Sequence, residues 1–354
     1  MRRLTKPSWL PVDPYIALLV ATVGLAALLP ARGGAATGVG WASSVAIGLL
    51  FFLYGTRLST REATQGLSHW RLHLTVVLST FAVFPLLGLA ARGLVPYVLT
   101  PQLYTGLLYL CVLPSTIQSS IAFTSIARGN VPAAICAGTY SSLLGMVGTP
   151  ALAALLMHSS GAGFSAHGLL DIGAQLLAPF LAGQLLRRWI GGFVARHKKV
   201  LGLVDRGSIL LVVYTAFSEG MVRGIWHQVT AVRLLALLGV EAVLLAVVLS
   251  LTAFTSRRLG FGRGDRIAIV FCGSKKSLAN GLPMASVLFG GQAGLMILPL
   301  MLFHQMQLMV CAVIAKRWSN DGHADGEGSL PEGPSSADTG SAPGGAAPAR
   351  PVPA

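Results

Sequence analysis

Long apolar runs alternate with short polar connections along almost the whole chain. Ten of these runs reach the length of about 20 residues that a helix needs to cross a bilayer. They lie near residues 14–30, 40–56, 73–91, 103–127, 131–157, 168–186, 207–222, 232–255, 266–288 and 293–315. The pattern predicts an all-α membrane protein with ten transmembrane helices.

The fourth and ninth runs each contain a polar interruption. In the fourth run, Pro114 is followed by S-T-I-Q-S-S, and the middle of the ninth run reads G-S-K-K-S-L-A-N-G-L-P. Unpaired backbone groups are costly in lipid, so a chain unwinds at membrane depth only where protein or a wet cavity satisfies those groups. Unwinding also exposes half-helix ends that attract ions. We therefore expect two discontinuous helices that line a central site.

The two interruptions occupy corresponding positions in the two halves of the chain. A shift of 161 residues places Cys111 on Cys272 and Ser119 on Asn280, and it pairs the fourth run with the ninth. Five spans in each half would give the second half the opposite orientation in the membrane. The sequence thus predicts an inverted repeat, with repeat 1 at about 14–157 and repeat 2 at about 168–316, and such repeats place a transporter's site at their matching breaks.

Composition and charge agree with a membrane protein. Of the 354 residues, 53% are hydrophobic and 11% are charged, whereas soluble domains carry about 25% charged residues. The net charge of +14 does not indicate nucleic-acid binding, because the basic residues do not form a patch with interleaved aromatics. Four cysteines lie inside apolar runs at spacings that suggest neither disulfides nor a zinc site.

The Lys and Arg residues also predict the orientation of the chain. Of the 26, 20 lie in connections on the side of the N-terminus, four lie on the opposite side, and the other two are Lys275 and Lys276. The positive-inside rule then places both termini in the cytoplasm. We expect a transmembrane domain at residues 1–318 in the cell (inner) membrane, and a disordered cytoplasmic tail rich in Gly, Pro, Ala and Ser at residues 319–354.

Several short motifs together resemble one known family. They are F-F-L-Y-G-T-R-L from Phe51, F-P-L-L-G from Phe84, L-P-S-T-I-Q-S-S from Leu113, A-R-G-N from Ala127 and F-C-G-S-K-K-S-L from Phe271. This combination resembles the bile acid:sodium symporter family, and more closely its SBF-like branch of transporters. The resemblance implies two inverted five-helix repeats, a core domain that moves against a panel domain, and unwound helices 4 and 9 that cross each other.

The resemblance also identifies candidate binding residues. The family's helix-4 motif keeps its serine as Ser119, and its asparagine is Ser120 here. In the family, helix 5 carries sodium-binding hydroxyl groups. These positions fall on or beside Ala134 and Gly138 here, and a one-residue gap in the alignment would instead bring Thr139 into place. The further candidates in and around the two unwound stretches are Ser115, Thr116, Gln118, Ser274, Ser277 and Asn280.

One departure from the family bears on the coupling ion. Related proteins hold sodium with a helix-9 glutamate, but this sequence has no acidic residue between Asp265 and Asp321. Lys275 and Lys276 occupy the stretch instead, and ammonium groups repel sodium at short range. We therefore expect no cofactor and no sodium site of the family's kind, with sodium or a proton left as possible coupling ions.

Three roles are open for Lys276, because a lysine at the bilayer centre faces a cavity or a partner. It is a tethered cation that replaces sodium and attracts an anion, a proton carrier, or the ion-pair partner of Glu241 or Glu219. Lys275 is expected to face a cytoplasmic vestibule. Glu241 is itself an intramembrane acid and hence a candidate functional residue.

No enzyme motif of the metalloprotease, prenyl-diphosphate or serine-hydrolase kind occurs in the chain. The two matching breaks favour secondary transport, and the family resemblance implies alternating access and a small-molecule organic anion, such as a bile-acid-like or other amphipathic carboxylate or sulfate, as the substrate. A membrane regulator or receptor that uses the same fold without transport is the alternative. The expected partners are this anion and the lipid bilayer, without nucleic acid, and the sequence does not set an oligomeric state.

Overall fold

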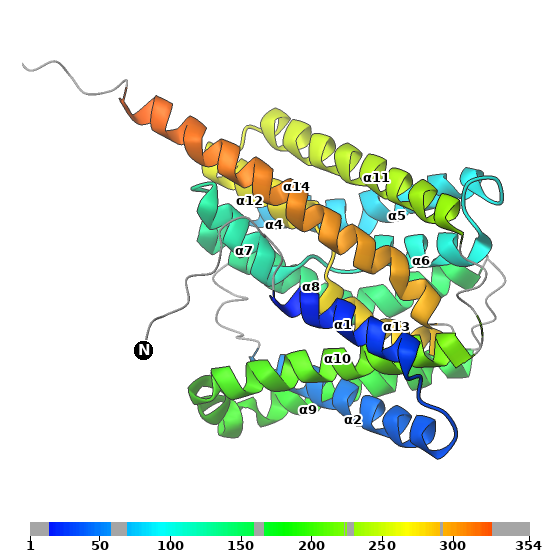
Figure 1. Ribbon diagram of the computed structural model, residues 1–354. Coiled ribbons are helices and arrows are strands. Elements are labelled where there is room, and N and C mark those ends of the chain that lie inside the picture. Colours follow the sequence, from blue (N-terminus) through cyan, green and yellow to red (C-terminus); the bar gives the residue numbers. More distant parts are fainter. Residues whose placement is uncertain are drawn as a thin grey trace, which may run out of the picture.

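The computed structural model describes residues 14–57, 69–158, 166–222, 224, 230–290 and 293–327, and these residues form helices without a strand (Figure 1). The elements are α1 (Pro14–Leu28), α2 (Gly34–Arg57), α4 (Trp70–Leu78), η2 (Ser79–Val83), α5 (Phe84–Ala90), η3 (Ala91–Leu94), α6 (Pro101–Val112), α7 (Ile117–Ile126), α8 (Val131–His158), α9 (Ala166–Arg196), α10 (Lys198–Val222), α11 (Ala231–Arg258), α12 (Arg263–Gly273), α13 (Leu278–Phe289) and α14 (Ala293–Glu327). Helices therefore cover every apolar run that the sequence singles out.

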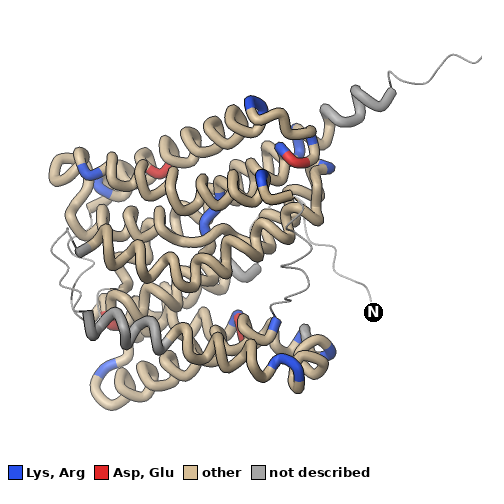
Figure 2. The backbone as a smooth tube through the Cα atoms, turned by 180° about the vertical axis from the view of Figure 1, so that it is seen from behind, with Lys and Arg blue, Asp and Glu red and all other residues tan. Residues whose placement is uncertain are grey.

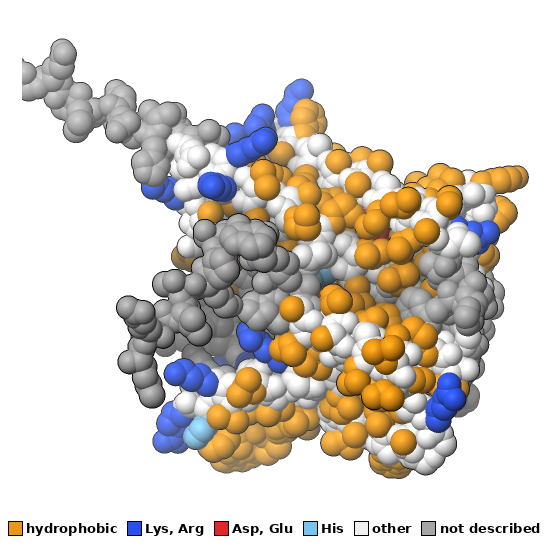
Figure 3. Space-filling model, in the orientation of Figure 1, with side chains coloured by type: hydrophobic (Ala, Val, Ile, Leu, Met, Phe, Trp, Pro, Cys, Tyr) orange, Lys and Arg blue, Asp and Glu red, His pale blue; other side chains and the backbone are white. Residues whose placement is uncertain are grey.

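Six of the described helices are long and apolar enough to cross a membrane, and a seventh span results if the bent pair α6 and α7 counts as one. Hydrophobic side chains cover much of the face between the two ends of the helices (Figure 3). Large apolar residues such as Leu28, Leu185 and Val232 are more than 70% exposed on this surface. Most Lys and Arg residues lie at the helix ends (Figure 2), so the outside of the molecule is suited to lipid.

The helices form two groups. In the first group, α2 packs against α9, and both α1 and α2 pack against α10 (Figure 1). The second group contains the remaining helices, and it meets the first mainly where α10 contacts α13 and α14 and where α8 contacts α9. The interrupted helices both belong to the second group.

Glycines allow the closest approach within the first group. A Cβ atom on Gly55 of α2 would lie 2.1 Å from the main-chain oxygen of Phe180, and one on Gly183 of α9 would lie 2.1 Å from that of Phe52. No side chain fits at either position, so the two helix backbones touch. Small residues at such contacts are a common way to pack helices in membranes.

The third apolar run contains a wide turn. Between α4 and α5, the five residues of η2 form a π-helical turn, which ends next to Pro85 in the first turn of α5. Proline has no N–H, so the usual hydrogen-bond ladder cannot continue through it, and a π turn is a common adjustment inside a helix.

The two polar interruptions are breaks in the structure. Residues 113–116 separate α6 from α7, which are bent by 64° relative to each other. Residues 274–277 separate α12 from α13. At the C-terminal end, α14 continues to Glu327, so residues 319–327 of the predicted tail are helical. The rest of the predicted tail, residues 328–354, lies outside the described residues.

Candidate functional site

The two breaks lie against each other and are joined by hydrogen bonds. The Ser277 N–H donates to the main-chain oxygen of Pro114 at 2.9 Å, and the Thr116 hydroxyl donates to the main-chain oxygen of Lys276 at 2.8 Å. We refer to the contact between residues 113–116 and 274–277 as the crossing. Each break thus satisfies backbone groups that the other exposes, as unwound helices at membrane depth require.

Serine hydroxyls donate hydrogen bonds to the last carbonyl groups of α12. The last carbonyl groups of a helix lack partners within it, and here the final four of α12 each accept a hydrogen bond from a serine. The pairs are Ser274 with Val270 at 2.6 Å, Ser120 with Phe271 at 3.0 Å, Ser115 with Cys272 at 2.5 Å and Ser79 with Gly273 at 2.9 Å. Ser274, Ser120 and Ser115 are predicted site residues, and in this conformation their hydroxyls stabilise the end of α12 at the break.

The ammonium group of Lys276 is enclosed by three main-chain oxygens. Its Nζ donates to Thr80 at 2.8 Å, to Cys111 at 2.8 Å and to Leu113 at 2.7 Å. We call these three oxygens the carbonyl cage. The ammonium also lies 4.1 Å from the centre of the Phe84 ring, and the side chain is fully buried. All three donors of the ammonium are therefore used.

Local breaks in the helices free these carbonyls. The Phe84 N–H bonds to the oxygen of Ser79 in the π turn, so the next carbonyl, that of Thr80, would need the N–H that Pro85 lacks. Cys111 and Leu113 lie at the end of α6, which stops before Pro114. Pro85 and Pro114 thus leave main-chain oxygens without helical partners, and these oxygens accept hydrogen bonds from the Lys276 ammonium.

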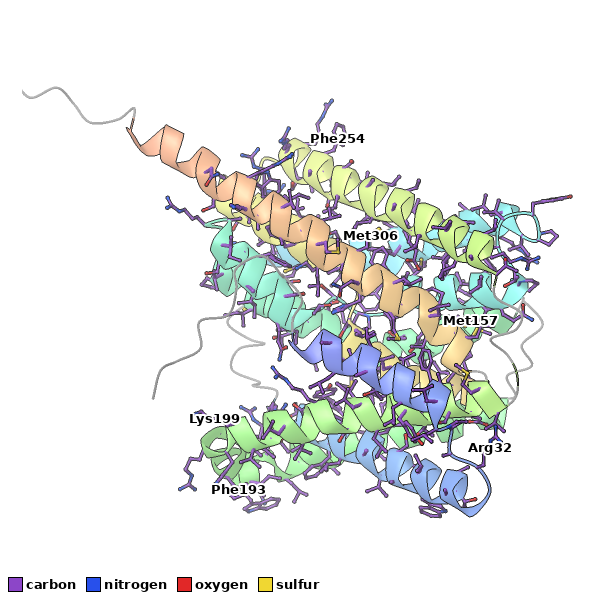
Figure 4. All side chains as sticks on the ribbon, viewed as in Figure 1. Arg32, Met157, Phe193, Lys199, Phe254 and Met306 are labelled. Atoms are coloured by element: carbon purple, nitrogen blue, oxygen red, sulfur yellow. The ribbon has the colours of Figure 1, made fainter. Side chains whose placement is uncertain are left out.

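A glutamine of α14 holds the main chain of Lys276. Gln307 accepts a hydrogen bond from the Lys276 N–H at 2.9 Å and donates one to the Lys276 carbonyl at 2.9 Å. Its amide nitrogen also lies 2.8 Å from Nδ1 of His304. Met306, the residue before Gln307, lies in the middle part of α14 (Figure 4). Sequence reasoning missed Gln307, although a buried glutamine in an apolar run is a signal that could have drawn attention to it.

Lys275 has a different environment from its neighbour. Its side chain is fully buried, and Nζ has no hydrogen-bond partner among the described residues. The ammonium lies 3.8 Å from the centre of the Phe123 ring and 5.5 Å from that of Phe271. The expectation that Lys275 faces an open vestibule is wrong for this conformation, because aromatic rings close over it.

The start of α13 is capped within the crossing. The Ser277 hydroxyl accepts a hydrogen bond from the Asn280 N–H at 3.2 Å, and the Asn280 side chain donates to the Ser142 hydroxyl at 3.4 Å. The buried Tyr109 hydroxyl donates to the main-chain oxygen of Gly281 at 2.7 Å. These contacts connect α13 to α6 and α8.

The remaining candidates lie around the crossing. Gln118 is exposed, and Ser119, beside it in the first turn of α7, has a buried hydroxyl without a partner among the described residues. Thr139 is buried on α8, next to Gly138, which approaches Ile117 closely. The first turn of α7 has no side-chain cap, so its N–H groups remain open to a polar ligand.

Glu241 is fully buried on α11, and neither carboxyl oxygen has a hydrogen-bond partner among the described residues. The proposed ion pair between Lys276 and Glu241 is therefore not formed, since the lysine uses its donors on the carbonyl cage. Both groups nevertheless lie close enough to the Cys111 side chain to act on it electrostatically. An acid–base pair joins Arg57 and Asp205, far from the crossing in sequence.

The described residues contain no group of three or more His, Cys, Asp or Glu that could hold a metal ion. At the crossing, the main-chain oxygens of Thr80, Cys111 and Leu113 surround the ammonium group of Lys276.

The helices are suited to lipid, and two interrupted helices are joined at buried polar groups, an arrangement that many transporters share. The model of the SBF-like CPA transporter family matches residues 13–320, and the chain belongs to this family. It is not an enzyme. The relationship to bile acid:sodium symporters that the sequence motifs suggest is thereby confirmed.

Individual relatives agree with the family. The chain is 54% identical to "Uncharacterized protein PA2026" of Pseudomonas aeruginosa, over 94% of this chain and 100% of the relative. It is 52% identical to "Putative symporter YfeH" of Escherichia coli, over 87% of this chain and 93% of the relative. Identity to "Sodium/bile acid cotransporter 7" of Mus musculus is 30%, over 85% of this chain and 91% of the relative.

Proposed function

We propose that the protein is a secondary transporter that moves an organic anion across the cell (inner) membrane by alternating access. Ten spans form two inverted five-helix repeats, and both termini are cytoplasmic. The group of α1, α2, α9 and α10 is the panel, and the remaining helices are the core that moves against it. The division of the helices into two packed groups supports this assignment.

The carbonyl cage around Lys276 carries the proposal. A related transporter is named for sodium, but here a tethered ammonium already occupies a site made of three main-chain oxygens, one from η2 and two from the end of α6. A lysine inside a membrane costs at least ~2.5–3.5 kcal/mol on insertion scales, so a chain that keeps one has a use for its charge. The fixed positive charge, together with the uncapped start of α7, favours an anionic substrate.

The substrate class follows from charge and polarity. A carboxylate or sulfate would be drawn to the N–H groups of α7 and to the exposed amide of Gln118. The relatives named for bile acids make amphipathic anions of that kind the first to test.

The experiment is uptake into proteoliposomes that contain the purified full-length protein. A panel of radiolabelled organic anions, including a bile acid, a smaller carboxylate and a sulfate ester, is compared with protein-free vesicles. Saturable uptake of at least one anion is expected. Failure of every anion to enter, with protein shown to be inserted and monodisperse, would favour the non-transporting regulator or receptor.

A further inference from the structure

We propose that Glu241 is the proton-binding residue that couples transport to a proton gradient, an inference that rests on the proposed transport function. Glu241 lies near the middle of α11 (Ala231–Arg258), and its side chain is 0% exposed. Both carboxyl oxygens are buried without a hydrogen-bond partner among the described residues.

Other acids in the described residues have different surroundings. Asp205 pairs with Arg57, and Asp265, in the first turn of α12, accepts a hydrogen bond from the Asn130 side chain at 2.7 Å. Glu219 of α10 is partly exposed. Among the acidic side chains that the structure describes, Glu241 is the one that is fully buried.

Burial without a donor favours the carboxylic acid over the carboxylate. An ionised carboxylate that leaves water without gaining a partner is penalised by several kcal/mol, whereas the neutral acid is penalised far less. Glu241 therefore holds a proton in this conformation. It ionises when movement of the helices brings water or a cation to it, which links proton uptake and release to the conformational cycle.

We assign the role of that cation to Lys276. α11 packs against α12, α14 and η2, and η2 has no titratable side chain. Toward α6, both Glu241 and Lys276 act electrostatically on the Cys111 thiol, and the Lys276 ammonium donates to the main-chain oxygen of Cys111. On α12 and α14, the buried thiols of Cys272 and Cys311 act on Lys275, and the imidazole of His304 lies beside the Gln307 amide.

These positions suggest two states of Lys276. With Glu241 protonated, the ammonium stays in the carbonyl cage, as observed. When the carboxyl loses its proton, the resulting carboxylate competes with the cage for the ammonium, and the crossing is loosened. The step is simple proton binding: the carboxylate takes one proton from the side to which the site is open and releases it on the other side.

Lys276 is the poorer proton carrier, because removing its proton would take a donor from the three carbonyls that it satisfies. Lys275 is the rival, since its ammonium is also buried without a hydrogen bond among the described residues. The experiment must therefore separate Glu241 from Lys275.

The first measurement does not depend on transport. Infrared difference spectra of the purified protein are recorded as pH is stepped, and the C=O stretch of a protonated, buried carboxylic acid is followed. We expect this band at neutral pH in the wild type and in the control Glu219→Gln, and its loss in Glu241→Gln. Persistence of the full band in Glu241→Gln overturns the proposal.

The second measurement uses proteoliposomes and radiolabelled taurocholate as the probe, or another anion of the panel if taurocholate is not taken up. An imposed pH gradient should drive accumulation by the wild type, Glu219→Gln and Glu241→Asp. Glu241→Gln should lose gradient-driven accumulation while retaining exchange of internal for external anion, which also shows that this variant is folded.

The outcomes distinguish the two proposals. Uptake by the wild type that ignores the pH gradient overturns proton coupling alone and leaves transport standing. Coupling through Glu241 is also overturned if Glu241→Gln still responds to the gradient while Lys275→Met does not. Absence of uptake of every anion by the wild type overturns transport itself, and coupling with it.

Discussion

The ammonium nitrogen of Lys276 lies 2.7 Å from the main-chain oxygen of Leu113, so the break between α12 and α13 is joined to the end of α6 by a charged side chain. Leu113 is the last residue before Pro114, and its carbonyl is freed because α6 stops there. The two interruptions therefore form one structural unit in which the charge of one break satisfies the backbone of the other.

Replacing Lys276 tests this unit. In Lys276→Gln, the carbonyl cage loses its cation, and unsatisfied buried acceptors cost about 1–3 kcal/mol each. We expect at least a tenfold loss of anion uptake at equal expression, and a similar loss in Lys276→Arg, because a planar guanidinium cannot direct three donors to three oxygens around one nitrogen. The control is Lys316→Gln, a change at an exposed position in the C-terminal half of α14. Wild-type uptake by both Lys276 variants would refute a functional role.

Chemical rescue provides an independent test of the carbonyl cage. Lys276→Ala removes the side chain but leaves the oxygens of Thr80, Cys111 and Leu113. Added n-propylammonium, which has three N–H donors and an apolar stem, is expected to restore part of the uptake. Tetramethylammonium has the same charge without a donor, and it should give no rescue. Equal effects of both ions would show that charge alone matters and that the cage does not.

Gln307 should stabilise the crossing without touching substrate. Gln307→Leu removes both hydrogen bonds to the Lys276 main chain and leaves the buried Lys276 N–H unpaired, while the Lys276 carbonyl keeps its bond from Thr116. The expected loss of stability is about 1–3 kcal/mol, seen as a lower melting temperature in detergent. The matched control is Gln305→Leu, on the same helix and partly buried. A melting temperature unchanged from that of the control would contradict the role of Gln307.

The glycine contact between α2 and α9 should tolerate no side chain. Gly55→Ala and Gly183→Ala place a methyl group 2.1 Å from main-chain oxygens, which cannot move aside as a side chain can. Overpacking typically costs about 1–3 kcal/mol and occasionally more. Gly48→Ala on α2 and Gly192→Ala on α9 meet nothing within 4 Å and serve as controls. Size-exclusion profiles and melting temperatures should be altered only in the first pair.

Much of the fold could be predicted from the sequence because lipid imposes a simple rule on each segment. A run of about 20 apolar residues must be helical to satisfy its backbone, so the helices follow the apolar runs. The breaks were also predictable, since Pro114 and the lysine stretch cannot continue an apolar helix. The helical start of the predicted tail was not, because its Gly- and Asp-rich composition gives no helical signal.

The partners of the site were much less predictable. Lys276 bonds to Thr80, which is 196 residues away, through a carbonyl freed by a π turn, and main-chain acceptors leave no trace in the side-chain pattern. The sequence therefore pointed to Glu241 as a partner of Lys276, and it left out Gln307. The different environments of Lys275 and Lys276 likewise depend on packing, because one ammonium meets main-chain oxygens and the other meets aromatic rings.

The central claim is that the caged ammonium of Lys276 takes the place of a sodium ion. The most direct measurement is the initial rate of anion uptake into proteoliposomes, with sodium outside or with sodium fully replaced by N-methylglucamine at the same ionic strength. Because the Lys276 ammonium replaces sodium, we expect the wild type to show equal uptake rates in the two media. A strong, saturable requirement for sodium would contradict it.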